Sequence, residues 1–426
     1  MQTKQMAQDT AVRAAGHADH RPTGDLACQV FRDWQSLEPL RQAWDECVAR
    51  TGGDIYLTYD WCRVWWQYYG HGYEPCLLVF RQDEQVVGLL PMMIDRLWLG
   101  PVRLRIAKIV GSEWTPVLMT PPVAAEHATA IYARAIEHLL RQEQCDAVRF
   151  APLAGEGPSR RQILQACEQI GPAACLVRDR ELGVNAVIDL PASYEQYLAG
   201  LKSNYRSTIR RIRKKFESEY APVAEVIDDP ARIEAAFDEF YNLHQARWHE
   251  VGKAGHFGEF PQALPYNRDL LRTLAAQGRA WISRLRVNDQ TIACEYNYVF
   301  NGVLYSRLAG RRTDEPWAHM SVARLSMLYL IEECMARGVH RIVLGTGGDQ
   351  HKRELGATEA PVGSIVIAAN RPWAAFKAGP LLRLRWRLVN TLYYHMWFDG
   401  WHQRLPLRLR RSLHHPLRGI WLRSRV

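Results

Sequence analysis

The sequence lacks the cysteine pattern of a disulfide-bonded or zinc-binding protein. It contains nine cysteines, an odd number, and no two of them are spaced as C-x-x-C. Neither a disulfide framework nor a zinc site is therefore indicated, and a reducing, cytoplasmic compartment fits better. No metal is expected.

Long hydrophobic runs are also missing. No stretch of about 18 consecutive apolar residues occurs, so no membrane-spanning helix is expected. Residues 1–24 are polar and rich in alanine and have no apolar core. They are predicted to form a disordered leader rather than a signal peptide.

Several widespread catalytic signatures are absent. The chain has no H-E-x-x-H, G-x-S-x-G or dinucleotide-binding G-x-G-x-x-G element, and it has no G-x-x-x-x-G-K-[ST] loop. These absences argue against zinc proteases, α/β-hydrolases, Rossmann dehydrogenases and P-loop nucleotide hydrolases.

Acidic residues are scarce near the C-terminal end. From Arg371 onward there are twelve Lys or Arg residues and a single acid, Asp399, so this segment alone carries +11. The whole chain carries +9, which leaves about −2 on the preceding 370 residues. The basic character therefore belongs to residues 373–426, which we interpret as a basic amphipathic extension.

Arg, Leu and Trp alternate within this extension, for example over residues 382–387. Such a segment can lie on an anionic membrane surface or contact nucleic acid through its phosphates. It can equally be a helix that packs on the second unit and exposes its arginines. We favour peripheral contact with the inner face of the membrane, and no DNA partner is expected.

Hydrophobic periodicity divides the remaining chain into two similar halves. In the first half, helices are expected over 31–66, 125–142 and 159–170, and strands over 76–80, 86–94, 147–151 and 184–190. In the second half, helices are expected over 194–219, 233–248 and 321–337, and strands over 280–287, 292–300, 303–309, 341–345 and 363–369. Asn301-Gly302, between two apolar runs, is a strong hairpin signal.

Each half is thus predicted to contain the same elements in the same order: a helix, a hairpin or meander, a second helix, a strand and a further strand. We infer an α/β fold made of two tandem units, residues 25–190 and 191–372. Each unit is expected to have a mixed, mainly antiparallel central sheet flanked by helices.

The segment from Leu344 to Lys352 is the most informative stretch for chemistry. Three glycines and the polar side chains of Asp349, His351 and Lys352 follow directly on a predicted strand end. Ligands of open α/β sheets bind at the carboxyl ends of strands, and glycines let the backbone approach them closely. The alternative is that these glycines serve only to turn the chain.

Three further elements could contribute to a site. The predicted helix 194–219 carries many cations, of which Arg206 and Arg210 lie beside its apolar stripe, so they could bind phosphate or simply form a solvated face. Glu295, in mid-strand, could be a general base in a cleft or could lie on a solvated sheet face. The helix end and loop after it offer His244, Arg247 and Trp248, either for a substrate cleft or for structural packing.

The order of these elements resembles a known group. Tyr205-Arg206, the His244-x-x-Arg247-Trp248 element, the meander, Ala309-Gly310 and Gly348-Asp349-x-x-Lys352 follow one another as in the CelD/BcsL-type acetyltransferases of the GNAT superfamily, which are associated with cellulose or exopolysaccharide biosynthesis. That group is similar to the FemAB peptidyltransferases, which pair two GNAT-like units. The resemblance is densest over residues 194–356.

The resemblance implies an acyl-CoA donor, such as acetyl-CoA, and an amine or hydroxyl acceptor on a sugar or envelope precursor that attacks the thioester directly. It implies catalytic roles for Asp349, His351, Lys352 and Glu295 and acceptor contacts from His244, Arg247 and Trp248. The donor would be held at the start of the helix near Ser321, with contacts from Gly310, Arg311, Arg206 and Arg210.

The usual pyrophosphate signature of GNAT enzymes, Q/R-x-x-G-x-G/A, is not found before Ser321. Two alternatives therefore stay open beside the acyl-CoA-dependent transferase. One is a FemAB-like transferase that uses aminoacyl-tRNA, and the other is a non-catalytic GNAT-fold accessory protein of a polysaccharide synthase complex.

Overall fold

The fold is built on one continuous sheet. The computed structural model describes residues 26–113 and 118–424, so the predicted leader over 1–24 lies outside the described residues. Twelve strands follow the order β1-β2-β3-β4-β5-β12-β6-β11-β10-β9-β8-β7. One end of the sheet holds β1 (Leu26–Phe31), β2 (Tyr73–Gln82), β3 (Gln85–Leu99), β4 (Val102–Ile109) and β5 (Ala147–Ala154), and the other holds β7 (Val223–Ile227), β8 (Ala280–Val287), β9 (Gln290–Phe300), β10 (Val303–Arg311) and β11 (Arg341–Thr346).

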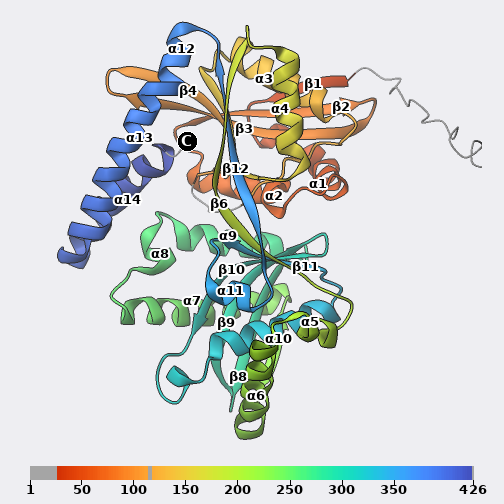
Figure 1. The fold of residues 1–426 in the computed structure, drawn as a ribbon, viewed down its shortest axis with the longest axis vertical. Helices are drawn as coiled ribbons and strands as arrows, with labels where there is room; N and C mark the ends of the chain where they lie inside the picture. Colours follow the sequence, from red (N-terminus) through yellow and green to blue (C-terminus); the bar gives the residue numbers. More distant parts are fainter. Residues whose placement is uncertain (1–25, 114–117, 425–426) are drawn as a thin grey trace, which may run out of the picture.

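Two long central strands join the two ends. β6 (Cys175–Asp189) comes from the first half of the sequence but pairs with β11, and β12 (Thr358–Ala369) comes from the second half but pairs with β5. β6 and β12 also pair with each other and run between the upper and lower parts of the molecule in Figure 1. The two halves therefore exchange their last strands.

Each end of the sheet contains one short parallel pair. β4 and β5 are in register over Ile106–Lys108 and Ala147–Arg149, and β10 and β11 over Val303–Tyr305 and Arg341–Val343. All other strand pairs within the described residues are antiparallel. This confirms the predicted α/β fold of tandem units with mixed, mainly antiparallel sheets.

The predicted boundary at residues 190 and 191 falls directly after β6 and stays a prediction. The sheet continues across it without a gap. One large hydrophobic core likewise includes side chains of both halves, among them Trp44 and Trp61 of the first and Phe237 and Tyr296 of the second. The rings of Tyr56 and Tyr305 meet across this contact at 5.2 Å.

The predicted meander is confirmed, because its turns have the required backbone. Asn288, Asp289, Asn301 and Gly302 have φ values of 48°, 62°, 50° and 72°. Two consecutive positive φ values match the twist of antiparallel strands, and Asn, Asp and Gly tolerate them best.

Two predicted helices are wrong as single elements. The helix expected over 194–219 is two helices, α5 (Tyr194–Gly200) and α6 (Ser203–Tyr220), because Leu201 is extended with ψ 152°. The segment 31–66 contains the end of β1, two 3-10 helices (Gln35–Leu40 and Ile55–Leu57), α1 (Arg41–Arg50) and the start of α2 (Tyr59–Tyr69), with a positive φ of 70° at Gly52 between α1 and α2. The strands β1, β4 and β7 were not predicted.

The remaining helices cover both ends of the sheet. They are α3 (Ala128–Glu137), α4 (Pro158–Ile170), α7 (Pro230–Glu250), α8 (Gly255–Glu259), α9 (Ala263–Ala275), α10 (Val322–Ala336) and α11 (Gln350–Glu354).

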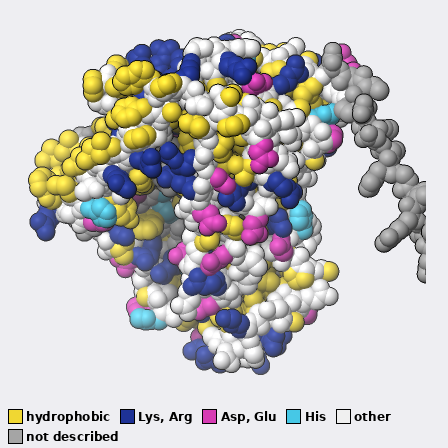
Figure 2. Space-filling view, turned by 45° about the horizontal axis from the view of Figure 1, so that its top comes forward, with side chains coloured by type: hydrophobic (Ala, Val, Ile, Leu, Met, Phe, Trp, Pro, Cys, Tyr) yellow, Lys and Arg dark blue, Asp and Glu magenta, His cyan; other side chains and the backbone are white. Residues whose placement is uncertain are grey.

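The extension is helical and folds back on itself. Residues 372–401 form one continuous helix that includes α12 (Pro372–Phe376) and α13 (Leu382–Asn390), and α14 (Leu407–Ser424) returns beside it. Lys377 pairs with Asp146 at 2.6 Å and Arg423 pairs with Asp95, both on the first unit, whereas Arg418 pairs with Glu259 of the second unit at 3.1 Å, so the extension packs on both units. Figure 2 shows hydrophobic side chains gathered along this side of the molecule, with Lys and Arg among them.

Candidate active site

A buried carboxylate lies in the middle of the second unit's sheet. Glu295 on β9 alternates with Cys294 and Tyr296, which pack into the core on the α7 side. Its own side chain therefore faces the opposite side, toward Ser326 of α10, and is only 3% exposed. Of the two alternatives for Glu295, the structure places it in a cleft and not on a solvated sheet face.

The environment of Glu295 favours a proton carrier. Burial raises the pKa of its carboxyl from 4.5 to about 7, although a hydrogen bond with Ser326 opposes this shift. Its Oε2 atom has no hydrogen-bond partner within the described residues. A carboxylate that titrates near neutrality and keeps a free lone pair can accept a proton from a bound substrate.

Two hollows meet at Glu295. The smaller, of about 190 Å³, is lined by Arg247, Trp248, Ala293, Glu295, Ala309, Gly310, Arg311, Ala323 and Ser326. The larger, of about 430 Å³, is lined by Tyr205, Glu295, Ser306, Ala309, Arg311, Ala318, His319, Ser321, Val322, Ala323, Arg324, Met327, His351 and Leu355. The shared residues make them one cleft, named the Glu295 cleft below.

The Glu295 cleft is electropositive at one side. Arg311, at the end of β10, lines both hollows, and burial together with the nearby cation of Arg247 lowers its pKa. The first turn of α10 begins at Val322 beside them, after Ser321 in the left-handed region with φ 51°. Two neighbouring arginines and a helix N-terminus together favour an anionic ligand.

Gly310 is required by the packing of α7 on β10. A Cβ atom at this position would lie 2.7 Å from the backbone nitrogen of His244 and 3.0 Å from the backbone oxygen of Phe240. The His244 Nδ1 atom lies 2.9 Å from the carbonyl oxygen of Ala309, and burial lowers the pKa of its ring, so Nδ1–H donates as a neutral imidazole. His244 thus stands behind the cleft wall, whereas Arg247 and Trp248, one turn later, line the cleft.

The glycine-rich strand end contributes only one side chain to the Glu295 cleft. His351 lines it, on α11. The Lys352 ammonium instead donates to the carbonyl oxygens of Thr346 and Gly347 at 2.8 and 3.2 Å, and lies 3.6 Å from the Asp349 carboxylate. The structure therefore brings His351 and Glu295 together but leaves Asp349 and Lys352 as contacts within the β11–α11 loop.

The predicted phosphate-binding cations of α6 lie outside the cleft lining. Arg206 donates to the carbonyl oxygen of Ala199 at 2.8 Å and so bridges the break between α5 and α6, while Arg210 is exposed. Their neighbour Tyr205 does line the cleft, with the Arg324 guanidinium 5.2 Å from its ring centroid. In the sequence, Tyr205 was noted only within the Tyr205-Arg206 element of the resemblance, without a role of its own, and no sequence signal pointed to Ser326 or Arg324.

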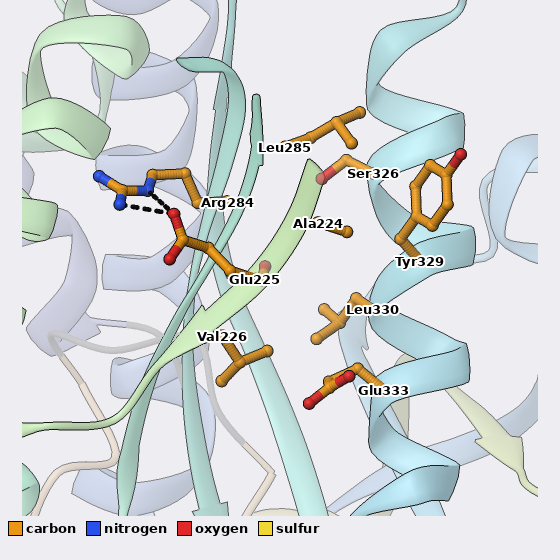
Figure 3. A pocket seen from close by; sticks show the side chains of 10 residues that line it. Ala224, Glu225, Val226, Arg284, Leu285, Ser326, Tyr329, Leu330 and Glu333 are labelled. Atoms are coloured by element: carbon orange, nitrogen blue, oxygen red, sulfur yellow. Dashed lines mark hydrogen bonds and ion pairs between the residues drawn. The ribbon is translucent and has the colours of Figure 1, made fainter. Parts of the chain in front are cut away.

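A shallow hollow lies on the other side of Ser326. Figure 3 shows it between α10 and the strands β7 and β8, with the Glu225–Arg284 ion pair at its edge. Its volume of about 20 Å³ suffices for about one water molecule. It is therefore no candidate for substrate binding.

A larger cavity of about 500 Å³ lies at the seam between the two units and α14. Its charged residues are engaged elsewhere: Glu113 with Lys108 and Tyr73, and Arg418 with Glu259 at 3.1 Å. No base comparable to Glu295 lines it.

Within residues 26–113 and 118–424, one group of side chains lies close enough together to approach a metal ion. Cys76, His138 and Glu143 offer ligand atoms within 4.8 Å of one another. Arg32 and Arg105 already pair with Glu143, and burial raises the pKa of the Cys76 thiol to about 12. A thiolate ligand is therefore costly here, and these residues fit a metal poorly.

Comparison with known proteins agrees with this geometry. Residues 203–353 match the model of the acetyltransferase (GNAT) domain family. This stretch is therefore similar to a GNAT-type domain. It contains β7 to β11, Glu295 and both sides of the Glu295 cleft, which supports an acyltransferase of the GNAT superfamily.

One solved structure, FemX, shows a similar fold over most of the chain. FemX is similar over 79% of this chain and 98% of its own, with a TM-score of 0.57 and 11% identity. L-PGS from Bacillus licheniformis (TM-score 0.48, 14% identity, 78% and 92% covered) and a tandem GNAT protein from the clavulanic acid biosynthesis pathway (0.40, 14%, 82% and 99%) also match. No curated relative matches the chain. The match to FemX, together with the family match over residues 203–353, supports the GNAT and FemAB-like fold, and the CelD/BcsL type stays a prediction.

Proposed function

We propose that this protein transfers an acyl group from acyl-CoA to an amine or hydroxyl acceptor in the Glu295 cleft. The observation that carries the proposal is the buried Glu295 carboxyl. It has a free oxygen and a pKa of about 7, and it lies between the first turn of α10 and two arginines.

The donor phosphates are proposed to bind at the start of α10. Ser321 and Arg311 would contact them directly, because both line the larger hollow. Gly310 lines the smaller hollow, and it lets α7, which carries Arg247 and Trp248, approach the end of β10 closely. Arg206 and Arg210, on the helix that carries Tyr205, would add long-range attraction for the anionic donor.

The acceptor would lose its proton to Glu295. As the N–H or O–H proton moves to the carboxylate, the acceptor atom attacks the thioester carbonyl carbon, and the carbon–sulfur bond breaks. The departing thiolate takes a proton from His351, which lines the same cleft. Asp349 and Lys352 would contribute by holding the loop that presents His351.

The acceptor is proposed to be a sugar or a cell-envelope precursor. The smaller hollow offers the Trp248 ring and the Arg247 guanidinium for its apolar and polar faces. His244 fixes this wall from behind by its bond to Ala309. Peripheral attachment to a membrane would suit an envelope-bound acceptor.

An aminoacyl-tRNA donor is the second candidate. Similarity to the FemX fold favours it, as do the exposed cations Arg210, Arg211, Lys214 and Lys215 on α6, which could follow a phosphate backbone. A non-catalytic accessory role is the third candidate. It gives no functional reason for a buried carboxylate at Glu295.

Calorimetric titration with acetyl-CoA and longer acyl-CoAs tests the proposal. We expect wild-type protein and Glu295→Gln to bind acyl-CoA equally, and only wild type to release free CoA thiol in the presence of acceptor sugars. Absence of acyl-CoA binding by wild type, together with binding of aminoacyl-tRNA, would establish the second candidate instead.

A further inference from the structure

Exposed large hydrophobic side chains concentrate in the extension. Of the 17 such side chains among the described residues, 11 lie between Trp373 and Ile420. Soluble surfaces carry single exposed apolar residues routinely, but contiguous groups of them mark interaction sites. The extension therefore presents a surface that needs a partner.

The apolar side chains follow one face of the helix over residues 372–401. Leu384, Leu388, Leu392 and Met396 recur in steps of four and are 48–58% exposed. Residues four apart lie on one helix face, so they form a stripe, named the outer stripe below. Trp373, 69% exposed, lies before the stripe and Trp401, 63% exposed, lies after it.

The opposite face of the same helix is already used. Ala378, Leu382, Tyr393 and Trp397 are buried. The returning helix α14 also has an exposed apolar face and a buried one, since Leu409, Leu413 and Ile420 are exposed and Leu422 is buried. The outer stripe is thus not core left uncovered by chance, because each helix has a separate buried face.

Cations without a carboxylate partner among the described residues border the outer stripe. Arg383 and Arg387 are exposed beside Leu384 and Leu388, and Arg404 is exposed where the helix ends. None of the three has a carboxylate partner within ranges 26–113 and 118–424, whereas Lys377 and Arg423 are paired with the first unit. An apolar stripe edged by free arginines matches the surface of an anionic bilayer, which attracts cations and takes up apolar side chains.

We infer that the extension, residues 372–424, is a docking surface for a bilayer that contains anionic phospholipid. No helix of the described residues is long and apolar enough to cross a membrane, so the outer stripe lies in the plane of the lipid surface. A second copy of this chain is a poorer partner, because residues 372–424 hold ten Lys or Arg and one acid, and two extensions of net charge +9 repel each other. Nucleic acid would contact the arginines through its phosphates but would leave the apolar side chains of the outer stripe without a partner.

Sedimentation with lipid vesicles tests this inference on the full-length protein. Wild type is expected to sediment with phosphatidylcholine vesicles that contain phosphatidylglycerol, to release as salt rises, and to bind pure phosphatidylcholine vesicles about tenfold more weakly. The triple variant Leu384→Glu/Leu388→Glu/Leu392→Glu should bind the anionic vesicles at least about tenfold more weakly than wild type. Val223→Glu, at another exposed apolar residue (57% exposed, on β7), is the matched control and should bind as wild type does.

The two components of the surface can be separated. Arg383→Glu/Arg387→Glu should lose binding to anionic vesicles at low salt, and circular dichroism should show an unchanged fold for every variant. If the wild-type protein does not sediment with anionic vesicles, the inference is overturned. It would equally be overturned by a wild-type dimer in sedimentation velocity that the triple variant abolishes, or by RNA binding that the triple variant retains while vesicle binding is absent.

Discussion

The Lys352 ammonium lies 2.8 Å from the carbonyl oxygen of Thr346, the last residue of β11. It also reaches the carbonyl oxygen of Gly347, and its side chain is 12% exposed. Lysine at this position therefore closes the loop between β11 and α11. Through that loop it fixes the position of His351 at the Glu295 cleft.

Replacing Lys352 with alanine should destabilise the protein more than replacing Asp349. Lys352→Ala leaves two carbonyl oxygens without their charged donor, which costs about 1–3 kcal/mol, whereas the exposed Asp349 carboxylate contributes at most about 1 kcal/mol. Thermal midpoints of both variants, measured at neutral pH, check this. If both midpoints match wild type while transfer is lost, Lys352 acts in the chemistry and not in the loop.

Gly310→Ala should destabilise the protein, because the added methyl group would lie 2.7 Å from the backbone nitrogen of His244. Overpacking of this kind costs about 1–3 kcal/mol, and separation of α7 from β10 would also displace Arg247 and Trp248. The control is Gly200→Ala, where a Cβ meets nothing within 4 Å. Urea midpoints should fall for the first variant and stay or rise for the second, and an unchanged Gly310→Ala midpoint would contradict the close packing.

The fold was predictable where local sequence determines structure. Asn301-Gly302 fixed a hairpin, and regular apolar spacing located α7 and α10. The exchange of β6 and β12 was not predictable, because pairing between strands about 180 residues apart leaves no local pattern. α5 and α6 merged into one predicted helix because the apolar spacing continues through Leu201, although Gly200 ends α5 directly before it.

The candidate site was predictable as a set of residues but not as an arrangement. Glu295 could be identified as an unusual mid-strand carboxylate, but its burial depends on Ser326 and α10, which lie about 30 residues later. Asp349 and Lys352 have the residue types of a catalytic pair, yet the carbonyl oxygens that hold Lys352 are backbone atoms, which sequence patterns do not reveal.

Arg311→Ala should weaken acyl-CoA binding by about tenfold, because a phosphate loses one charge-assisted hydrogen bond at the start of α10. The burial of Arg311 and its proximity to Arg247 make this cation costly without an anion, so the apo protein should lose little stability. Arg210→Ala, an exposed cation on α6, is the comparison and should change the dissociation constant much less. Calorimetry measures both, and equal losses would move the phosphate site toward α6.

Transfer activity should rise with pH and level off above about 7, because Glu295 must be ionised to accept the acceptor's proton. The profile of kcat/KM against pH measures this. His351→Ala is expected to lower the plateau but to keep the rise at the same pH. A rise that persists unchanged in the residual activity of Glu295→Gln would assign it to another group.

Glu295→Gln should stabilise the protein at pH 8 and have little effect at pH 4.5. The pKa of Glu295 is about 7 in the folded protein against an ordinary 4.5, so the folded state binds the proton more tightly. The contribution of Glu295 to stability is therefore fully present below pH 4.5 and is lost as pH rises through 7, by an upper bound of about 3 kcal/mol. Glutamine does not titrate, so the difference in thermal midpoint between the variant and wild type should grow over this range.

Glu156→Gln, at an exposed carboxyl, is the control and should show no such growth. A constant difference across pH would mean that the Glu295 carboxylate is solvated, and the proposed general base would then lose its physical basis.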